Sequence, residues 1–503
     1  MERLAELIQD HPDTDNAIGA PGRDWMTYGD LRTLTLTVRQ TLRAAGIGAQ
    51  DRVAIVLPNG PEMAAAFVTV AQSATTAPLN LAYKEDEFAF YLEDLKAKAI
   101  IVETDYDGPA RRVAKRFDMI VIELTENNPA GSFTLSTTAT GSAADTVPGS
   151  DDVALILHTS GTTSRPKIVP LLQSNVAASA DNVRDSLALT KDDCCLNVMP
   201  LFHIHGLIAA VSGSLAAGAS ISCAPGFDTL KFFSWLEEVG PSWYTAVPTM
   251  HQAILARAPR NAAIIENARL RFLRSSSSSL PGPVMTQLAE TFGAPVVEAY
   301  GMTEAAHQMC CNPIEPGRQK PGAVGLPAGP EVRIADEIEN RLINGVGEIS
   351  ISGPNVTPGY EANPEANEKN FFEAEGKRWF RTGDQGEFDE DGFLSLTGRL
   401  KEIINRGGEK ISPLEVDGIL SDHPAVGQCV TFAVPHAKLG EDVGAAVVLK
   451  EGQSATDREI RDFASQRLAA FKVPRKILIL DEIPKGATGK LQRIGLAEKL
   501  GLG

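Results

Sequence analysis

Short apolar runs alternate with amphipathic stretches along the first part of the chain. Residues 53–57 (VAIVL) predict a buried strand, and residues 99–102 predict the next one. Between them, residues 62–73 place apolar side chains at helical spacing, so we expect a helix with one apolar side. Strands that alternate with helices are typical of βαβ units, and the pattern therefore favours a parallel sheet.

A second alternating region follows a segment rich in Gly, Ser, Thr and Pro at residues 129–150, which predicts a surface connection. Further strands are predicted at residues 154–157, 220–223, 243–246, 272–274 and 296–298.

The pattern changes beyond Cys311. Short apolar segments separated by Gly, Pro and Asp predict a small antiparallel β region, with strands at residues 332–334, 347–351 and 392–396. After Gly398 the chain becomes charged, and it then alternates again through residues 430–434 and 445–449. We therefore expect a domain boundary near residues 398–402 and a C-terminal domain of about 100 residues.

Composition excludes several classes of protein. With 43% hydrophobic and 22% charged residues in 503, the chain is neither disordered, nor collagen, nor a coiled coil. Its net charge of −17 makes nucleic acid and anionic membranes unfavourable partners, although backbone N–H groups can still bind a small anion. The charged N-terminus does not resemble a signal peptide, and residues 206–224 are too weakly apolar to span a bilayer. Six cysteines without zinc spacing indicate free thiols, so we expect a cytoplasmic protein.

The strongest local motif is HTSGTTSRPKIVP at residues 158–170, directly after a predicted strand. Its small residues can fold their N–H groups around phosphate oxygens, and Lys167 adds positive charge. Runs of this composition are often solvated linkers, but the preceding strand and the Arg-Pro-Lys ending favour phosphate binding. The motif differs from a Walker A loop. The residues expected to contact phosphate are Ser160, Gly161, Thr162, Thr163 and Ser164.

Four further segments carry chemistry. In EAYGMTEAAH, Tyr300 can stack on a base, Thr303 can bond phosphate and Glu304 can hold Mg2+, although a helix start would use the same residues. In WFRTGD, Asp384 can receive ribose hydroxyls or simply cap a turn. The last two are GRLKEIINRGGEKI at residues 398–411 and PKGATGKLQR at residues 484–493.

In this order, the five segments resemble those of the adenylate-forming superfamily of acyl-CoA synthetases, luciferases and peptide-synthetase adenylation domains. The resemblance covers essentially the whole chain. It implies an α/β fold with a large N-terminal body, residues 1–397, made of two αβ-layered subdomains and a small β subdomain. A smaller α+β C-terminal lid, residues 398–503, would follow a hinge near residues 398–402. The resemblance also implies Mg2+ as cofactor, with ATP and coenzyme A as cosubstrates, and leaves the oligomeric state open.

The resemblance further implies a role for each motif residue. Residues 160–164 with Lys167 would cradle the β- and γ-phosphates, Thr303 would meet phosphate, and Glu304 would hold Mg2+. Glu298 and Tyr300 would belong to the nucleotide site, with Tyr300 on adenine, while Asp384 and Arg399 would bind the ribose. Lys401 would lie at the hinge, Gly407 and Gly408 would line the pantetheine channel, and Lys490 would bridge the substrate carboxylate and the α-phosphate. Lys490, Thr303 and Lys167 are thus the expected catalytic residues.

One position departs from the family pattern. Ile168 follows Lys167 where relatives usually have glycine, and a β-branched residue does not readily adopt positive φ. Either the loop accommodates the isoleucine, or ATP binding is altered.

The acyl site of the family is formed by segments that are unusually polar here. They contain His203, His205, His307 and the serine row at residues 275–279, which would suit a second carboxylate and would line an alkyl chain poorly. A charged or donor imidazole could pair with that carboxylate. His203 can instead be a gate or packing residue, and a serine row can be a tight loop.

The combined acyl-site pattern looks most like the oxalate–CoA ligase branch of the family. We expect Ser277 and His307 to contact the distal carboxylate, with His203 nearby. Malonate–CoA ligase, 4-coumarate or medium-chain acyl-CoA ligase and an inactive binding module are the alternatives.

Overall fold

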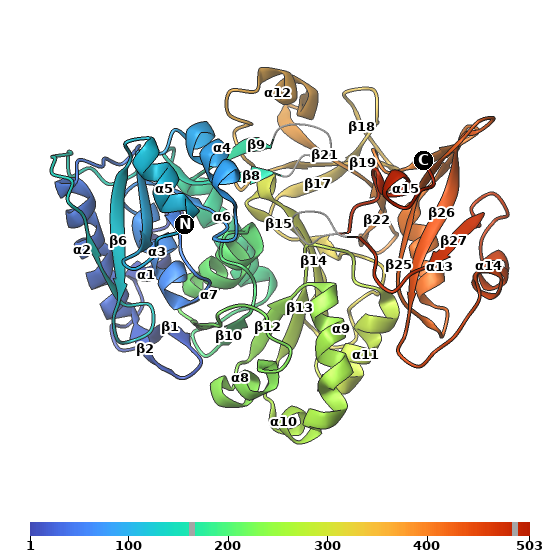
Figure 1. Cartoon of the computed structure of the whole chain (residues 1–503), viewed down its shortest axis with the longest axis horizontal. Coiled ribbons are helices and arrows are strands. Elements are labelled where there is room, and N and C mark those ends of the chain that lie inside the picture. Colours follow the sequence, from blue (N-terminus) through green and yellow to red (C-terminus); the bar gives the residue numbers. More distant parts are fainter. Residues whose placement is uncertain (160–165, 485–490) are drawn as a thin grey trace.

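The computed structural model describes residues 1–159, 166–484 and 491–503. The N-terminal part of the body, blue to teal in Figure 1, is built on a seven-stranded sheet with the order β7-β6-β5-β3-β4-β8-β9. Its strands are β3 (Arg52–Val56), β4 (Thr75–Pro78), β5 (Ala99–Glu103), β6 (Ile120–Glu126), β7 (Phe133–Ser136), β8 (Val153–Thr159) and β9 (Lys167–Leu172). The predicted strands at residues 53–57 and 99–102 are confirmed as β3 and β5, which pair in parallel.

Two details of this region differ from the prediction. The helix expected at residues 62–73 exists as α3 (Pro61–Ala71), but it is buried on every side because it packs against α2 (Tyr28–Ala44) and strands of both large sheets. Its acidic Glu62 is therefore ion-paired, with Arg23 at 2.7 Å. The segment at residues 129–150 is more than a connection, since it contributes β7 to the edge of the sheet.

A nine-stranded sheet forms the second αβ layer, with the order β16-β15-β14-β13-β12-β10-β11-β1-β2. The strands are β1 (Asn16–Ala20), β2 (Arg23–Thr27), β10 (Cys194–Asn197), β11 (Ser220–Cys223), β12 (Trp243–Ala246), β13 (Phe272–Ser275), β14 (Val296–Met302), β15 (His307–Cys311) and β16 (Leu326–Pro327). Strands β10 to β14 pair in parallel, and β15 returns antiparallel to β14. Strands β11 to β14 lie at predicted positions, whereas β10 was not predicted. One continuous apolar core joins this sheet to the first.

Helices cover both sheets. Those of the body include α4 (Glu85–Leu95), α5 (Pro109–Arg116), α6 (Gln173–Ser186), α8 (Phe232–Val239), α9 (Pro248–Arg257) and α11 (Gly282–Phe292). A π-helix, η1 (His205–Ser212), lies between β10 and β11 in the sequence and is wholly buried.

The predicted small β region is confirmed as a six-stranded antiparallel sheet. It contains β17 (Glu331–Ala335), β18 (Leu342–Ile343), β19 (Gly347–Ser352), β20 (Phe371–Ala374), β21 (Lys377–Phe388) and β22 (Leu394–Arg399), with α12 (Pro364–Asn370) beside β20.

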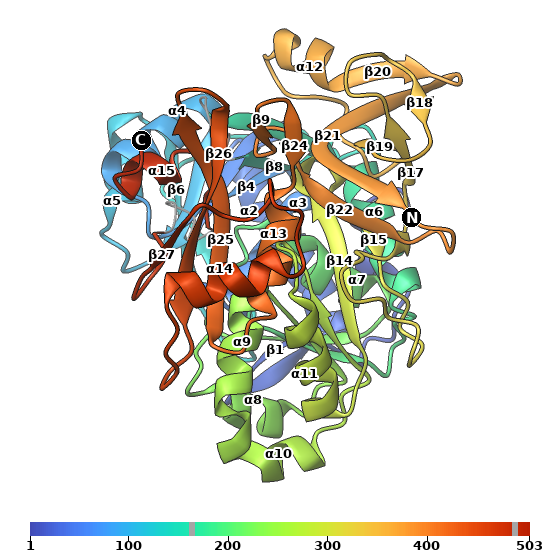
Figure 2. The same cartoon turned by 90° about the vertical axis from the view of Figure 1, so that its right-hand side faces the viewer.

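The C-terminal part, orange to red, lies beside the body in Figure 1 and faces the viewer in Figure 2. It combines a five-stranded sheet with helices: β23 (Ile404–Arg406), β24 (Glu409–Ile411), β25 (Val426–His436), β26 (Gly440–Leu449), β27 (Lys476–Ile479), α13 (Pro413–Ser421), α14 (Asp457–Ser465) and α15 (Leu496–Lys499). The boundary segment predicted near residues 398–402 includes the last two residues of β22 of the body and ends before β23 of this domain. That boundary and the hinge role of Lys401 remain predictions.

Candidate active site

Residues from distant segments meet where β12, β13 and β14 end. Strand β13 leads into the serine row, β14 leads into a short 3-10 helix, η3 (Thr303–Ala305), and β15 begins at His307. The π-helix η1 brings His205 to the same place, because its ring stacks on that of His307 with centroids 5.3 Å apart. The sheet and η1 thus bring together three of the residues that the sequence singled out for the acyl site, His205, Ser277 and His307.

A polar cluster of His205, Ser277, His307 and Thr245 forms there. His205 Nδ1 lies 2.9 Å from Ser277 Oγ, and its Nε2 lies 2.6 Å from Thr245 Oγ1. The other predicted residues take different places. His203 is exposed with its ring against Phe202, Ser276 donates to the Ala299 carbonyl, and Ser278 and Ser279 are exposed.

Ser277 and His307 have unusual backbone conformations. Their φ angles are +71° and +99°, which non-glycine residues adopt at a cost of about 1–3 kcal/mol. Such strain is common at functional sites, where the surrounding structure enforces it. Both strained residues belong to the polar cluster, and both were expected to contact the acid.

Sequence reasoning missed Arg274 as an individual site residue. It is fully buried at the end of β13, and its Nη2 donates to His307 Nε2 at 2.9 Å. Since a guanidinium group only donates, the His307 ring must accept at Nε2 and carry its proton on Nδ1. Burial, with a further contribution from Arg274, holds the pKa of His307 well below its usual value. Of the two expected forms, the structure therefore favours a neutral donor imidazole.

Only part of the predicted phosphate-binding site lies within the described residues. Ser160, Gly161, Thr162, Thr163, Ser164 and Lys490 lie outside the described residues. Lys167 begins β9 opposite Thr159, and its Nζ lies 4.3 Å from the ring centre of Tyr360. The Tyr360 hydroxyl donates to Glu304 Oε1 at 2.7 Å. Tyr360 thus contacts both Lys167, which was predicted to bind phosphate, and Glu304, which was predicted to bind Mg2+. No sequence pattern had indicated Tyr360.

The carboxylate of Glu304 fits a magnesium-binding role. It is buried beside half-buried Thr303, and burial raises its pKa, whereas the nearby Lys167 lowers it. Mg2+ commonly uses one or two protein carboxylates and takes its remaining oxygen ligands from phosphates and water. Among the described residues, no group of three or more His, Cys, Asp or Glu side chains could hold a metal, so Glu304 would need such additional ligands.

The residues expected at the nucleoside are brought together. The Tyr300 hydroxyl donates to Asp384 Oδ2 at 2.6 Å, and Arg399 Nε lies 3.3 Å from Asp384 Oδ1. Asp384 and Arg399 face each other across β21 and β22. Burial raises the pKa of Asp384, and the Arg399 guanidinium opposes that effect. The roles of these three residues toward ATP remain predictions.

Glu298 has a buried carboxyl group that accepts from the Leu280 N–H at 2.8 Å and so holds the end of the serine row. Burial raises the pKa of Glu298 from 4.5 to about 8. Its predicted role at the nucleotide is separate from this contact and stays a prediction.

This carboxyl group should make stability depend on pH. Between pH 4.5 and about 8 the folded protein holds a proton that the unfolded chain releases, so this contribution to stability falls as pH rises. Glu298→Gln, which mimics the protonated form, should therefore raise the unfolding midpoint relative to wild type more at pH 8.5 than at pH 5. Thermal unfolding at both values measures the difference. The exposed control Glu290→Gln should show no such change, and equal shifts for Glu298→Gln at both pH values would contradict the prediction.

Gly407 and Gly408 form the tight turn between β23 and β24. Their φ angles are +62° and +98°, a combination that a two-residue hairpin requires and glycine permits. Both are exposed. The turn alone accounts for two glycines here, and their predicted place beside pantetheine stays a prediction.

Ile168 is accommodated in strand β9. It pairs with His158 in extended conformation, is buried, and packs in the apolar cluster that contains Ile156 and Val102. The position therefore makes no demand for positive φ, which answers the concern raised by the sequence for this residue.

We expect Ile168→Gly to destabilise the protein without improving ATP use. Removing a buried isoleucine side chain costs about 2–5 kcal/mol, and glycine in a strand adds up to about 1 kcal/mol. The thermal unfolding midpoint should fall clearly, whereas the conservative Ile168→Val should lower it only slightly. A glycine variant with unchanged stability and a lower KM for ATP would contradict this expectation.

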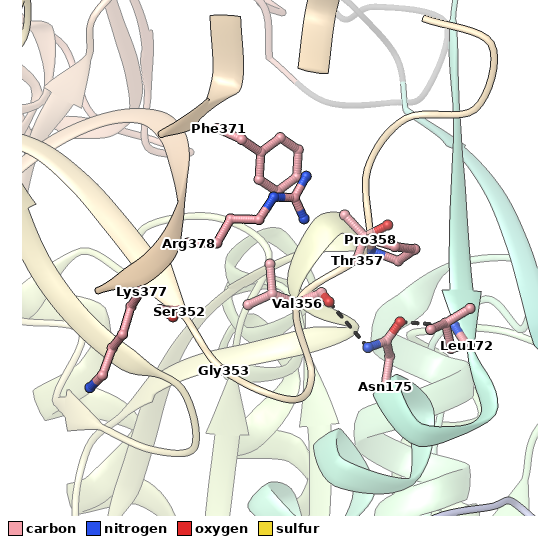
Figure 3. Close-up of a pocket in the computed structure, with 10 residues that line it drawn as sticks. All are labelled: Leu172, Asn175, Ser352, Gly353, Val356, Thr357, Pro358, Phe371, Lys377 and Arg378. Atoms are coloured by element: carbon pink, nitrogen blue, oxygen red, sulfur yellow. Dashed lines mark hydrogen bonds between the residues drawn. The ribbon is translucent and has the colours of Figure 1, made fainter. Parts of the chain in front are cut away.

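A cavity of about 370 Å³ lies elsewhere, between the start of α6, the segment after β19, and strands β20 and β21 (Figure 3). The Arg378 guanidinium there lies 3.7 Å from the ring centre of Phe371. None of the residues that the sequence singled out lines this cavity.

The fold and these motif residues define an adenylate-forming enzyme, and the comparisons agree. The chain belongs to the AMP-binding enzyme family, whose model matches residues 4–361, and the model of the AMP-binding enzyme C-terminal domain matches residues 415–490. Among curated relatives, it is 44% identical to "Oxalate--CoA ligase" of Arabidopsis thaliana, covering 98% of this chain and 96% of that protein. It is 42% identical to "Oxalate--CoA ligase" of Saccharomyces cerevisiae, covering 97% and 93%. The crystal structure of ATP-bound MatB from Rhodopseudomonas palustris superposes with a TM-score of 0.87 at 28% identity, covering 99% and 98%.

All six cysteines are free thiols, five of them buried, as expected for packing residues. In the described part of the chain, none of the helices has the length and apolar character needed to cross a membrane.

Proposed function

We propose that this protein is an oxalate–CoA ligase, an acid–thiol ligase that uses ATP to join oxalate to coenzyme A. The observation that carries the proposal is the polar cluster of the buried His205 and His307 with the half-buried Ser277, beside Arg274. Buried polar groups of this kind suit a second carboxylate and leave an alkyl chain poorly accommodated. The similarity to two oxalate–CoA ligases over nearly the full chain supports the same substrate.

The reaction has two steps. A carboxylate oxygen of the acid attacks the α-phosphorus of ATP, the bond to the β-phosphate breaks, and pyrophosphate leaves. The thiolate of coenzyme A then attacks the acyl carbon, the bond to the adenylate oxygen breaks, and AMP leaves. No nucleophilic side chain is required by either step.

Within this proposal, cations reduce the repulsion between the carboxylate of the acid and the α-phosphate of ATP. Lys490 acts on the substrate carboxylate and α-phosphate, while Lys167 and Thr303 meet the terminal phosphates with residues 160–164. Mg2+, held by Glu304, supplies charge neutralisation on the phosphates when bound. Asp384 and Arg399 hold the ribose, and Tyr300 and Glu298 complete the nucleoside side. Gly407 and Gly408 border the pantetheine arm, and Lys401 lies at the hinge between residues 1–397 and 398–503.

The cysteines and the net charge indicate the cellular location and the partners. Six free thiols support a cytoplasmic location, where cysteines stay reduced. The partners are small-molecule substrates, and the net charge of −17 disfavours nucleic acid.

Substrate preference can be measured directly. AMP release and ATP–pyrophosphate exchange with oxalate, malonate, acetate, hexanoate and coumarate should show the highest kcat/KM for oxalate, dependent on coenzyme A and Mg2+. Preference for hexanoate or coumarate would refute the short-dicarboxylate assignment. Preference for malonate would support a ligase of short dicarboxylates but would make malonate, rather than oxalate, its substrate.

A further inference from the structure

Arg274 is a buried cation for which the described residues supply no anion. Its side chain is fully buried, and the hydrogen-bond acceptors around it are neutral: His205, Thr245, His307 and Gln308. Its Nε has no hydrogen-bond partner within the described part of the chain. Burying a charge is costly unless it is paired, so this arrangement calls for a counter-ion.

Other buried arginines of the chain are satisfied differently. Arg381 forms an ion pair with Glu348 at 2.7 Å. Arg43 donates to three backbone carbonyls, those of Ile47, Ser73 and Thr146, although its Nε, like that of Arg274, has no hydrogen-bond partner among the described residues. Arg274 instead lies against His307, which was predicted to contact the acid, and against His205, which was predicted to belong to the acyl site. Its charge is thereby connected to the acyl site.

The geometry fixes what these imidazoles can present. Arg274 donates to His307 Nε2 at 2.9 Å and to His205 Nε2 at 3.3 Å, which leaves Nδ1 as the donor nitrogen of each ring. His205 Nδ1 faces Ser277 Oγ, whose own proton is then available to a ligand. A Cβ on Gly301 would clash with the His307 carbonyl oxygen and would lie 3.2 Å from its Nδ1, so glycine at this position leaves room for the His307 backbone and places no side chain against that nitrogen.

The backbone of Arg274 is also held in place. His251 Nε2 lies 3.2 Å from the Arg274 carbonyl oxygen, and the Tyr244 hydroxyl lies 3.3 Å from His251 Nδ1. This contact holds the backbone from which the side chain extends, and the hydrogen bonds of the guanidinium to His205, His307 and Gln308 hold the charge itself, as a preorganised binding site needs.

We propose that Arg274 is the positioning residue that makes the acyl site select a second carboxylate. Its guanidinium orients and polarises both imidazoles. His307 donates from Nδ1 toward the distal carboxylate of a short dicarboxylate, and His205 acts through Ser277, whose hydroxyl donates to the same carboxylate. This inference rests on the proposed function and extends it to a residue that does not itself need to touch the acid. A hydrocarbon tail in the place of the distal carboxylate would leave the charge of Arg274 uncompensated. Binding a monocarboxylate therefore costs free energy, and the site selects dicarboxylates.

Selectivity between oxalate and acetate tests the inference. Arg274→Met removes the charge with little change in volume, Arg274→Lys keeps a charge that cannot contact both imidazoles at once, and Arg43→Met controls for the loss of a buried arginine. ATP–pyrophosphate exchange gives kcat and KM for both acids, calorimetry gives ATP affinity, and thermal unfolding reports folding.

For Arg274→Met, we expect the oxalate KM to rise about thirtyfold or more, from the loss of charge-assisted bonding. The kcat/KM for acetate should stay the same or rise, because the variant removes the uncompensated charge, and ATP affinity should be retained. Arg274→Lys should lose about three- to tenfold in the oxalate-to-acetate ratio, and Arg43→Met should leave that ratio unchanged.

Equal losses for oxalate and acetate in folded Arg274→Met would overturn the inference and leave Arg274 a structural residue. If that variant does not fold, an unchanged acid ratio in Arg274→Lys overturns it instead. Wild-type preference for malonate would refute the proposed substrate alone, and malonate then replaces oxalate in the ratio. A wild-type enzyme that accepts no dicarboxylate would overturn both.

Discussion

Replacing Lys490 by alanine is expected to slow acyl-adenylate formation by about 100- to 1,000-fold while leaving ATP affinity nearly unchanged. The acid and the α-phosphate are both anions, so charge develops between them in the transition state, and a lysine acts there as a mobile point charge. An interaction made mainly in the transition state affects the rate far more than ground-state binding. Single-turnover measurements of adenylate formation and calorimetry with ATP separate the two quantities.

Lys499→Ala provides the matched control. Lys499 is an exposed lysine of the same domain, in the last turn of α15, and its loss should leave adenylation unchanged. Adenylation at the wild-type rate in Lys490→Ala would show that another residue supplies the charge.

Replacing His307 by alanine should raise the KM for oxalate by about tenfold to a hundredfold, the value of a lost charge-assisted bond of ~1.5–3 kcal/mol. The structure explains why oxalate binding should weaken. The neutral His307 ring accepts a hydrogen bond from Arg274 at Nε2 and therefore has its donor proton on Nδ1. Its ring also stacks on His205, which contacts Ser277. The KM for ATP should move little, and acetate should lose less than oxalate in steady-state assays.

His307→Asn separates the loss of the ring from disruption of the strained backbone. Asparagine tolerates positive φ and keeps a side-chain oxygen, so it should fold at least as well as the alanine variant. Equal losses for oxalate and acetate in both variants would mean that His307 supports the fold or the metal site alone.

Much of the sheet architecture could be predicted from local pattern. Strands β11 and β12 match their predicted bounds, because Gly or Pro residues on both sides limit each short run. Edge strand β7 was missed, since its four residues lie in a polar segment and are fixed by pairing with β6. The burial of α3 on all sides was missed for a related reason: its second partner is a sheet formed largely by residues much later in the chain.

The candidate site divides in the same way. The motif order alone predicted an adenylate-forming enzyme, and the polar acyl segments predicted a short dicarboxylate. An arginine in an otherwise apolar strand, RFLRS, was the available sign of Arg274, but sequence does not tell whether such a residue meets a carboxylate or none. Nothing in the sequence around Tyr360 indicated a role at the site, because its hydrogen-bond partner Glu304 is 56 residues away.

The sequence by itself determined which elements form and which residue types the chemistry can use, since strand propensity, turn residues and phosphate-binding composition are properties of neighbours along the chain. Tertiary structure alone decided that Ser277 meets His205, that His307 is a neutral donor, that Ile168 packs in a strand, and that Arg274 is buried without a carboxylate. Arg274 and His307 are 33 residues apart, and their contact depends on the register of adjacent strands and on backbone angles that no local pattern specifies. Protonation and charge pairing follow from those contacts, because the solvent that would otherwise satisfy these groups is excluded from the core.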